Sequence, residues 1–227
     1  MEIKPIAYFR SPFSSKFGIP KQAGLVAELE GQIVFEPEFR NPDALRGMEG
    51  FDYLWLIWEF SANRHKAHSP VVRPPVLGGN EKVGVFATRS PFRPNNIGLS
   101  SVKISHIEWE TPHGPVIHVK GADLMDKTPI FDIKPYVPLS DCVPDALEGY
   151  TKMTKEHILS VHIPEEKALL FPKNKLAALK EILQLDPRPG YDDSPEKLYG
   201  LSFAGYNIKF SVKNDVLCVS DIEKIKR

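Results

Sequence analysis

The sequence predicts a mainly β protein, in which a larger N-terminal part built from short strands is followed by a small α+β part. Two observations lead to this prediction. Up to about residue 145, apolar residues come in short runs of branched and aromatic side chains separated by Pro, Gly and Asn, a spacing typical of a barrel or sandwich. After it, the chain contains one amphipathic helical pattern and one hairpin pattern. We therefore expect one domain over residues 1–145 and a second over 146–227.

Six apolar runs in the first part are predicted strands. The segment 51–60 is almost continuously apolar, which indicates a strand covered on both faces or a central barrel strand. Before it, NPDALRGMEG predicts a short helix capped by Asn41, with Pro42 at the first helical position and Gly47 or Gly50 at its end. The six runs are IKPIAYF, FDYLWLIWEF, KVGVFATR, SSVKISHIEW, PVIHVKGADL and PIFDIKPYV.

The second part contains a predicted helix, a loop and a hairpin. The helix covers KNKLAALKEILQL, with Asn174 as its cap, and LDPRPGYDDSP then ends it and forms a loop. Three leucines share one face of this helix: Leu176, Leu179 and Leu183. The hairpin covers NIKFSVKNDVLCVSDI, in which apolar residues alternate before a Lys-Asn-Asp turn: Ile208, Phe210 and Val212.

Composition argues against several classes of protein. Lys plus Arg equals Asp plus Glu, at 29 each, so no global charge drives the chain onto nucleic acid or an anionic membrane. Cys142 and Cys218 lie far apart without a C-x-x-C spacing, so we expect neither a disulfide framework nor a metal site. No stretch approaches the roughly 20 apolar residues that span a bilayer. We expect a cytoplasmic protein without a membrane partner.

The segment GVFATRSPFRPNNIGLSSV, residues 84–102, combines positive charge with rigidity. Pro91 and Pro94 punctuate it too closely for one helix or one strand, so it is predicted to contain a shaped loop. Arginine offers a planar donor fork for phosphate or carboxylate, or stacks on a base. A surface loop with solvated arginines is the competing interpretation. Between Ser69 and Ile107 the only acid is Glu81, and the cations are Arg73, Lys82, Arg89, Arg93 and Lys103.

A second cluster lies in GADLMDKTPIFDIKPY, residues 121–136, where Asp123, Asp126 and Asp132 precede Lys134 and Tyr136. These groups could serve a sulfonium, a metal or proton transfer. The spacing does not match a calcium loop, so we do not predict a metal site. The alternative is that the aspartates form turns and the tyrosine belongs to the core.

Common nucleotide and hydrolase signatures are missing from the sequence. There is no Walker-type G-x-x-x-x-G-K-[ST], no G-x-S-x-G, and no G-x-G-x-x-G between a strand and a helix. An adenosine-type ligand would therefore need another cradle. Near the N-terminus, RSPFSSKFGIPKQAG offers a second constrained polar loop. Two such loops could face one pocket, but two unrelated turns are the favoured interpretation of the residues alone.

In four stretches the chain resembles the TsaA-like (TrmO) family, tRNA methyltransferases that use S-adenosylmethionine and a β-barrel in place of the usual doubly wound sheet. The stretches are SPFSSKFGIPKQAGL, ALRGMEGFDYLWLIWEF, VRPPVLGGNEKVGVFATRSPFRPNNIGLSSV and DLMDKTPIFDIKPYVP. The tail is similar through DPRPGY and FAGYNIKFSV. The resemblance implies methylation of N6 of threonylcarbamoyladenosine beside the tRNA anticodon, an N-terminal β-barrel, and a homodimer with the cofactor site near the subunit interface.

The same resemblance implies site residues. Ser61 stands where many members have a histidine, so a role for that imidazole does not transfer, and Asn96 replaces a common proline before Ile97-Gly98. The implied cofactor contacts are Pro20, Lys21, Gln22, Ser61, Ala62, Arg89, Leu99, Asp123, Leu124 and Met125. Substrate contacts are expected from Arg73, Arg93 and Lys134, and the candidates for a general base are Asp126, Asp132 and Tyr136.

Two other functions remain open at this stage. One is a non-catalytic RNA-binding barrel, which would bind tRNA without cofactor-dependent turnover, and the other is a methyltransferase with a different substrate. If the region after residue 145 is a tRNA-substrate module, its removal is expected to abolish tRNA binding and leave cofactor binding intact.

Overall fold

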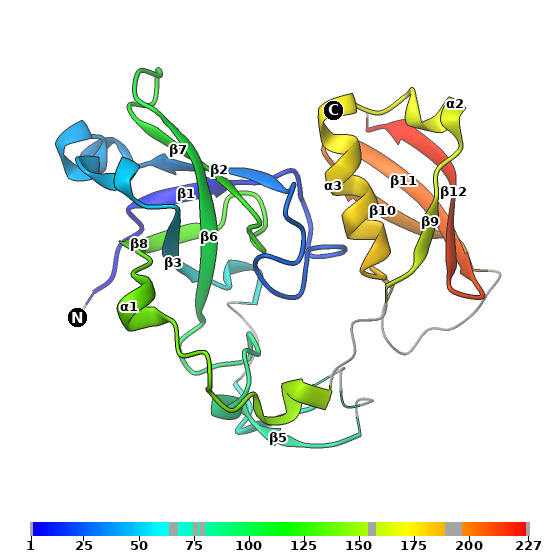
Figure 1. Cartoon of the computed structure of the whole chain (residues 1–227), viewed down its shortest axis with the longest axis horizontal. Coiled ribbons are helices and arrows are strands. Elements are labelled where there is room, and N and C mark those ends of the chain that lie inside the picture. Colours follow the sequence, from blue (N-terminus) through cyan, green and yellow to red (C-terminus); the bar gives the residue numbers. More distant parts are fainter. Residues whose placement is uncertain are drawn as a thin grey trace.

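The computed structural model describes residues 2–63, 68–74, 77, 80–153, 158–188 and 197–225. Two sheets dominate it, and Figure 1 shows them side by side: six strands close into a barrel, and four form a smaller C-terminal sheet. A short ribbon of β4 (Val71–Val72) and β5 (Val83–Gly84) lies at the bottom of the view. The predicted mainly β class is confirmed.

Every neighbouring pair in the barrel is antiparallel, and the order around it is β1-β2-β7-β6-β3-β8. Antiparallel strands with alternating apolar residues can fill such a small barrel with side chains from every strand. The barrel strands are β1 (Ala7–Arg10), β2 (Glu30–Phe35), β3 (Tyr53–Glu59), β6 (Ile97–Glu108), β7 (Val116–Lys120) and β8 (Pro129–Pro135).

Strand β3 illustrates how the barrel core forms. Leu54, Leu56 and Trp58 point inward and are buried, whereas Tyr53, at the start of the strand, is exposed. β3 pairs with β6 on one side and β8 on the other, so the expectation of a central barrel strand is confirmed. Apart from Glu59, its outward residues are apolar or aromatic as well, which matters for the site described below.

The segments between the strands differ in part from the sequence predictions. NPDALRGMEG forms two 3₁₀ segments, Pro42–Leu45 and Met48–Gly50, instead of one helix. The predicted cap is correct, because the Asn41 side chain accepts a hydrogen bond of 3.0 Å from the Asp43 N–H. Gly47 interrupts the helical path at φ 88°. In KVGVFATR, the strand is only Val83–Gly84 and a 3₁₀ turn, Val85–Ala87, follows it.

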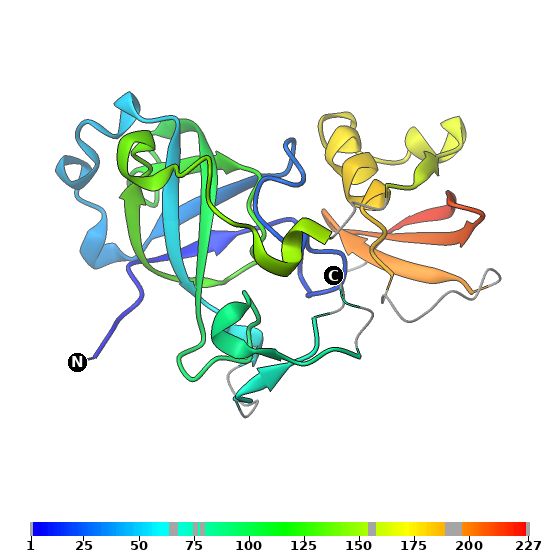
Figure 2. The same cartoon turned by 60° about the horizontal axis from the view of Figure 1, so that its bottom comes forward.

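The C-terminal sheet has the order β10-β11-β12-β9, with β9 parallel to β12. The predicted hairpin is β11 and β12, and its turn places Asn214 and Asp215 at positive φ, which suits the tight hairpin turn. Figure 2 shows α3 lying over one face of this sheet. The elements are β9 (Ser160–His162), α3 (Lys173–Gln184), β10 (Tyr199–Phe203), β11 (Tyr206–Lys213) and β12 (Val216–Lys224).

Helix α3 confirms the predicted apolar face and corrects the predicted cap. Leu179 and Leu183 are fully buried against the sheet, and Leu176 packs at the edge of the same core. The helix begins at Lys173 after Pro172, so Asn174 lies inside the first turn and no side chain caps the helix. The predicted loop after the helix falls largely on residues 189–195, outside the described ones.

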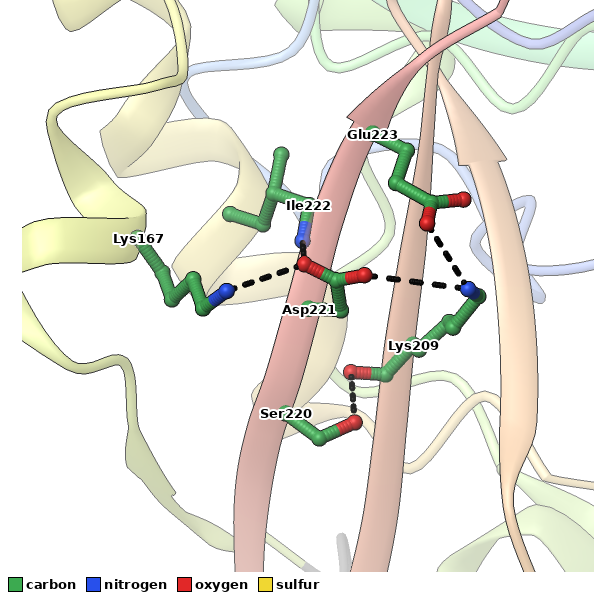
Figure 3. A network of polar contacts seen from close by, with 6 residues as sticks. All are labelled: Lys167, Lys209, Ser220, Asp221, Ile222 and Glu223. Carbon is green, nitrogen blue, oxygen red and sulfur yellow. Dashed lines mark hydrogen bonds and ion pairs between the residues drawn. The ribbon is translucent and has the colours of Figure 1, made fainter.

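A network of charged side chains ties the short helix α2 (Glu165–Ala168) to β12, as Figure 3 shows. Asp221 accepts a hydrogen bond from Lys167 at 3.0 Å and lies 3.7 Å from the Lys209 ammonium, which also contacts Glu223 at 3.0 Å. The Lys167 hydrogen bond, above all, lowers the pKa of Asp221. This network lies beside the register shift of the β11–β12 pair between Lys209 and Phe210.

The C-terminal core also contains residues from the N-terminal part of the chain. Phe13, Val26 and Leu29 are buried together with side chains of α3 and of the C-terminal sheet, and Phe17 and Ile19 pack at the edge of this core. The composition shift near residue 145 did not indicate this contact. Segment 11–29 thus packs into the core of a region that follows it by more than a hundred residues.

In the described part of the chain, no helix combines the length and the apolar character needed to cross a membrane.

Candidate functional site

A cavity of about 460 Å³ opens at the end of the barrel where β3 finishes and β6 begins. Its volume falls in the range typical of sites for small molecules. Five separate segments form its wall, and apart from the starts and ends of strands they are loops. The segments are 16–22, 58–63, 88–93, 97–99 and 123–128.

A hydrogen-bonded chain of three side chains lies at the cavity wall. The Trp58 indole N–H donates to the Ser100 hydroxyl at 3.0 Å, and that hydroxyl donates to the Asp123 carboxylate at 2.6 Å. Because Ser100 accepts from the indole, its own proton is directed to Asp123. Burial raises the pKa of Asp123, while the hydrogen bond from Ser100 and the charge of Arg89 oppose that shift. Asp123 is therefore a half-buried, oriented carboxyl group facing a ligand-sized space.

Close packing at Gly98 shapes the same wall. A Cβ atom at this position would lie 2.4 Å from Trp58 Cε2, closer than atoms can pack. The glycine therefore allows the indole to lie against β6 and to reach Ser100. This explains the glycine of the Ile97-Gly98 pair in steric terms.

The two polar loops meet at one cavity and are not unrelated turns. Arg89 Nη1 donates to Gln22 Oε1 at 2.7 Å, which joins the 88–93 segment to the 16–22 segment. Lys16 Nζ donates to the Ala62 carbonyl at 2.8 Å and also to Asn63 Oδ1. The loops that border the cavity are thus linked to each other around its opening.

All but one of the residues expected to contact a cofactor line this cavity. Leu124 is the exception, because it is only 1% exposed and belongs to the barrel core. The residues at the cavity wall are Pro20, Lys21, Gln22, Ser61, Ala62, Arg89, Leu99, Asp123 and Met125. Sequence reasoning did not identify Trp58, which is part of an apolar run, or Lys16, which stands before the PKQ loop.

Arg93, expected to contact the substrate, also lies at the cavity wall. Its Nη1 donates to the backbone carbonyls of Val85 at 3.1 Å and Thr88 at 2.7 Å, and its guanidinium lies over the Phe86 ring. The side chain therefore fixes the loop that carries Arg89. Arg73 is exposed directly after β4, outside the cavity wall.

Asp132 and Lys134 lie on the outer face of the barrel, next to the cavity. Asp132 pairs in register with Ile57, which pairs in turn with Leu99 at the cavity wall. Two strand spacings, about 10 Å, therefore separate the backbones of Asp132 and Leu99. Lys134 Nζ lies 2.9 Å from Asp132 Oδ2.

Aromatic side chains lie on the same outer face of the barrel. Together with Asp132 and Lys134, the residues Tyr53, Trp55 and Tyr136 form what we call the outer strip. The Tyr136 ring packs against Trp55 at 5.6 Å and Tyr53 at 6.3 Å between centroids. Burial raises the pKa of Tyr136, and Cys142 and Asp141 add to the shift. Lys134 is not among the groups that shift this pKa, so it does not activate the phenol. A phenol in this state is a poor general base near neutral pH.

Asp126 has a structural role in its loop. Its Oδ1 accepts from the Ser11 N–H at 3.2 Å, and its own N–H donates to the Phe13 carbonyl at 2.8 Å. The carboxylate lies outside the cavity wall. Of the three candidates for a base, Asp132 combines a position beside the cavity with an exposed carboxylate.

The arrangement suits a polar organic ligand with a flat second reactant beside it. Donors from the linked loops and one half-buried carboxyl group line the cavity, and aromatic rings with an Asp-Lys pair lie along the adjoining strip. Within the described residues, no group of three or more His, Cys, Asp or Glu side chains could hold a metal ion.

Comparisons with known proteins agree with this geometry. The family model described as "tRNA-methyltransferase O N-terminal domain" matches residues 8–142, and "TrmO C-terminal domain" matches residues 165–225. The chain is 36% identical over 219 residues to a tRNA (adenine(37)-N6)-methyltransferase of Escherichia coli, covering 93% of each protein. It is 35% identical to a putative S-adenosylmethionine-dependent methyltransferase of Pseudomonas aeruginosa, covering 97% of this chain and 96% of that protein.

A solved structure is similar over almost the full length. The crystal structure of TrmO from Pseudomonas aeruginosa has a TM-score of 0.79 and is 30% identical, covering 98% of this chain and 97% of that one.

Proposed function

The chain belongs to the TrmO family of tRNA methyltransferases, and we propose that it transfers a methyl group from S-adenosylmethionine to N6 of the adenosine at tRNA position 37. The observation that carries the proposal is the cavity itself. It gathers the loop segments that resemble the family, and a half-buried carboxyl group, around a space of ligand size. The relatives named as methyltransferases match this chain over both its N-terminal and its C-terminal part.

The residues of the cavity fit S-adenosylmethionine. Asp123 offers a fixed carboxyl group that can accept hydrogen bonds from ribose hydroxyls or face the cationic part of the cofactor. The linked loops of Gln22 and Arg89 can hold its carboxylate and base edges. S-adenosylmethionine supplies the methyl group when bound. The protein aligns the sulfur, methyl carbon and acceptor nitrogen, and excludes water from the line between them.

We propose that the acceptor is threonylcarbamoyladenosine and that it lies along the outer strip. The Trp55 and Tyr136 rings offer a stacking surface for a base. Lys134 can contact the threonyl carboxylate, which adds a negative charge beside the reacting base. In this proposal Asp132 accepts the N6 proton as the methyl group arrives, supported by its position beside the cavity.

Arg73 and Arg93 are assigned more limited roles. Arg73 is exposed directly after β4 and could contact a tRNA phosphate there. Arg93 contributes through the loop that it holds, since its Nη1 is engaged by backbone carbonyls.

The proposed working form is a cytoplasmic homodimer. Large apolar side chains are exposed at and near the cavity mouth, among them Leu99 and Phe86. A second copy that covers them would also complete the wall of the cavity. Dimerisation would also bring together the basic 69–107 stretches of two chains. The combined surface could attract tRNA although one chain has no net charge.

Nucleoside mass spectrometry tests the reaction. Purified protein is incubated with tRNA carrying threonylcarbamoyladenosine, with and without S-adenosylmethionine. We expect a gain of one methyl group on that nucleoside only when the cofactor is present. A protein that binds cofactor but leaves the nucleoside unmodified would point to another substrate. A protein that binds tRNA but no cofactor would favour a non-catalytic RNA-binding role.

A further inference from the structure

We propose that the C-terminal sheet positions the cofactor loop, so that Leu201 and Phe203 of β10 set the affinity of the cavity for S-adenosylmethionine without touching it. The inference rests on the proposed function, because it concerns the same cavity. It assigns to the C-terminal region a part in cofactor binding in addition to any contact with tRNA.

The loop in question, residues 11–29, consists of turns and bends without a helix or strand. Lys16, Ile19 and the Pro20-Lys21-Gln22 run nevertheless lie at the cavity wall. A segment without ladder hydrogen bonds keeps one conformation only if its side chains and ends are held by neighbouring structure. The geometry of this cavity wall therefore depends on the contacts made by the loop.

Barrel contacts hold the two sides of this loop. The Asp126 N–H donates to the Phe13 carbonyl at 2.8 Å, and the Gly24 N–H donates to the Gly121 carbonyl at 2.8 Å. Between these points, the apolar side chains of Phe17 and Ile19 pack against the C-terminal core. The part of the loop that carries the cavity residues thus lies between the barrel and the C-terminal sheet.

β10 supplies the main contacts from the C-terminal side. The Phe13 and Phe203 rings lie 5.1 Å apart between centroids and are 0% and 1% exposed. The Ala204 N–H donates to the Pro12 carbonyl at 2.9 Å. An aromatic pair of this kind contributes beyond its buried area and fixes the mutual orientation of the two rings.

Leu201 contacts the loop two residues before Pro20. Gly18 has φ +83°, and a Cβ atom placed on it would lie 2.2 Å from Leu201 Cδ1. The loop backbone therefore passes directly over the leucine side chain. Any shift of β10 moves this backbone, and with it the Pro20-Lys21-Gln22 run.

A matched pair of phenylalanines tests the inference. Phe203 and Phe210 are both fully buried in the C-terminal core, but Phe203 packs on Phe13 of the loop, whereas Phe210 packs on Tyr199 within the sheet. Phe203→Leu and Phe210→Leu, made in the full chain, should lower Tm to a similar extent. We expect Phe203→Leu alone to raise the Kd for S-adenosylmethionine, by about tenfold, in isothermal titration calorimetry.

Linkage gives a second measurement. If β10 and the cavity are coupled, S-adenosylmethionine must slow amide hydrogen exchange in Tyr199–Phe203 of the wild-type protein. Should Phe203→Leu fail to fold, Leu201→Val replaces it. This variant removes one methylene group beside Gly18, and its Kd for S-adenosylmethionine is compared with that of Phe210→Leu in the same way.

The outcomes separate this inference from the function on which it rests. Wild-type protein that binds S-adenosylmethionine, with equal Kd values for both phenylalanine variants and unchanged exchange in β10, would overturn the positioning role and leave the methyltransferase assignment intact. Wild-type protein that binds no S-adenosylmethionine would overturn the proposed function and this inference with it.

Discussion

At the scale of single residues, burial and the hydrogen bond from Ser100 shift the pKa of the Asp123 carboxyl group in opposite directions, and burial has the larger effect. Burial alone favours the neutral acid, and the Ser100 hydroxyl favours the carboxylate. Because the pKa of Asp123 is raised, the neutral form gains population as pH falls from neutral. If the carboxylate is the form that binds S-adenosylmethionine, cofactor affinity must fall in the same direction.

The Ser100→Ala variant tests this relation. Removing the donor leaves the burial effect unopposed, so the pKa of Asp123 rises further. The midpoint of the pH dependence of the Kd for S-adenosylmethionine should move to higher pH, as measured by calorimetry across a pH series. Asp123→Asn is the control, since it should weaken binding and remove the pH dependence. An unchanged midpoint in Ser100→Ala would contradict the role given to the hydroxyl.

Asp132 and Asp126 can be distinguished by a pair of isosteric variants. Asp132→Asn should lower kcat for methyl transfer by about 10²–10⁴-fold and leave the Kd for S-adenosylmethionine unchanged, because it removes the proposed base only. Asp126→Asn should lower Tm and keep most of kcat, because its carboxylate holds the Ser11 N–H. Single-turnover kinetics with saturating cofactor separates the two. The reverse pattern would transfer the role of base to Asp126.

At the scale of elements, the Asp221 network fastens α2 to β12. Because the pKa of Asp221 is lowered by its hydrogen bond to Lys167, its stabilising effect is present above the unfolded value of about 4 and is lost as pH falls through the folded value. Asp221→Asn should therefore cause a small fall in Tm at pH 7 and a smaller one at pH 3. The side chains are partly exposed, so solvent screening keeps the effect small. An equal difference at both pH values would show that charge is not involved.

The sequence predicted most elements whose pattern is local. β3, α3 and the β11–β12 hairpin follow from apolar periodicity and turn residues, and the structure confirms all three. β2, with the sequence EGQIVF, was missed because a glycine and polar residues interrupt its apolar run. Glycine is needed at position 31 because the Phe9 ring occupies the space that any side chain would take. This contact forms only when β1 and β2 pair in the barrel.

In the candidate site, too, sequence patterns indicate contiguous motifs but not contacts between distant segments. Loop residues such as Gln22 and Arg89 could be assigned through resemblance, because their motifs are contiguous. The Trp58–Ser100–Asp123 chain could not, since it joins three strand or loop segments that meet only when the barrel closes. The support that β10 gives to the cofactor loop was hidden for the same reason.

At the scale of the whole molecule, the exposed apolar residues after β8 bear on the oligomeric state. Leu139 is 96% exposed and Leu147 is 100% exposed, and Val143 lies exposed between them. A run of large apolar side chains on one surface segment is typical of a protein–protein interface. These residues follow the strand that carries Asp132 and Lys134, so a partner seated here would lie close to the proposed acceptor strip.

Light scattering coupled to size-exclusion chromatography tests this arrangement. We expect the wild-type protein to have a mass of twice the 25.6 kDa of one chain. Leu139→Glu combined with Leu147→Glu should shift it toward one chain, because charged groups would be buried without partners at the interface. Leu169→Glu is the matched control, since that residue is 71% exposed in the C-terminal region and should leave the dimer intact. A wild-type mass of 25.6 kDa would contradict the dimer, and the cavity would then have to be complete within one chain.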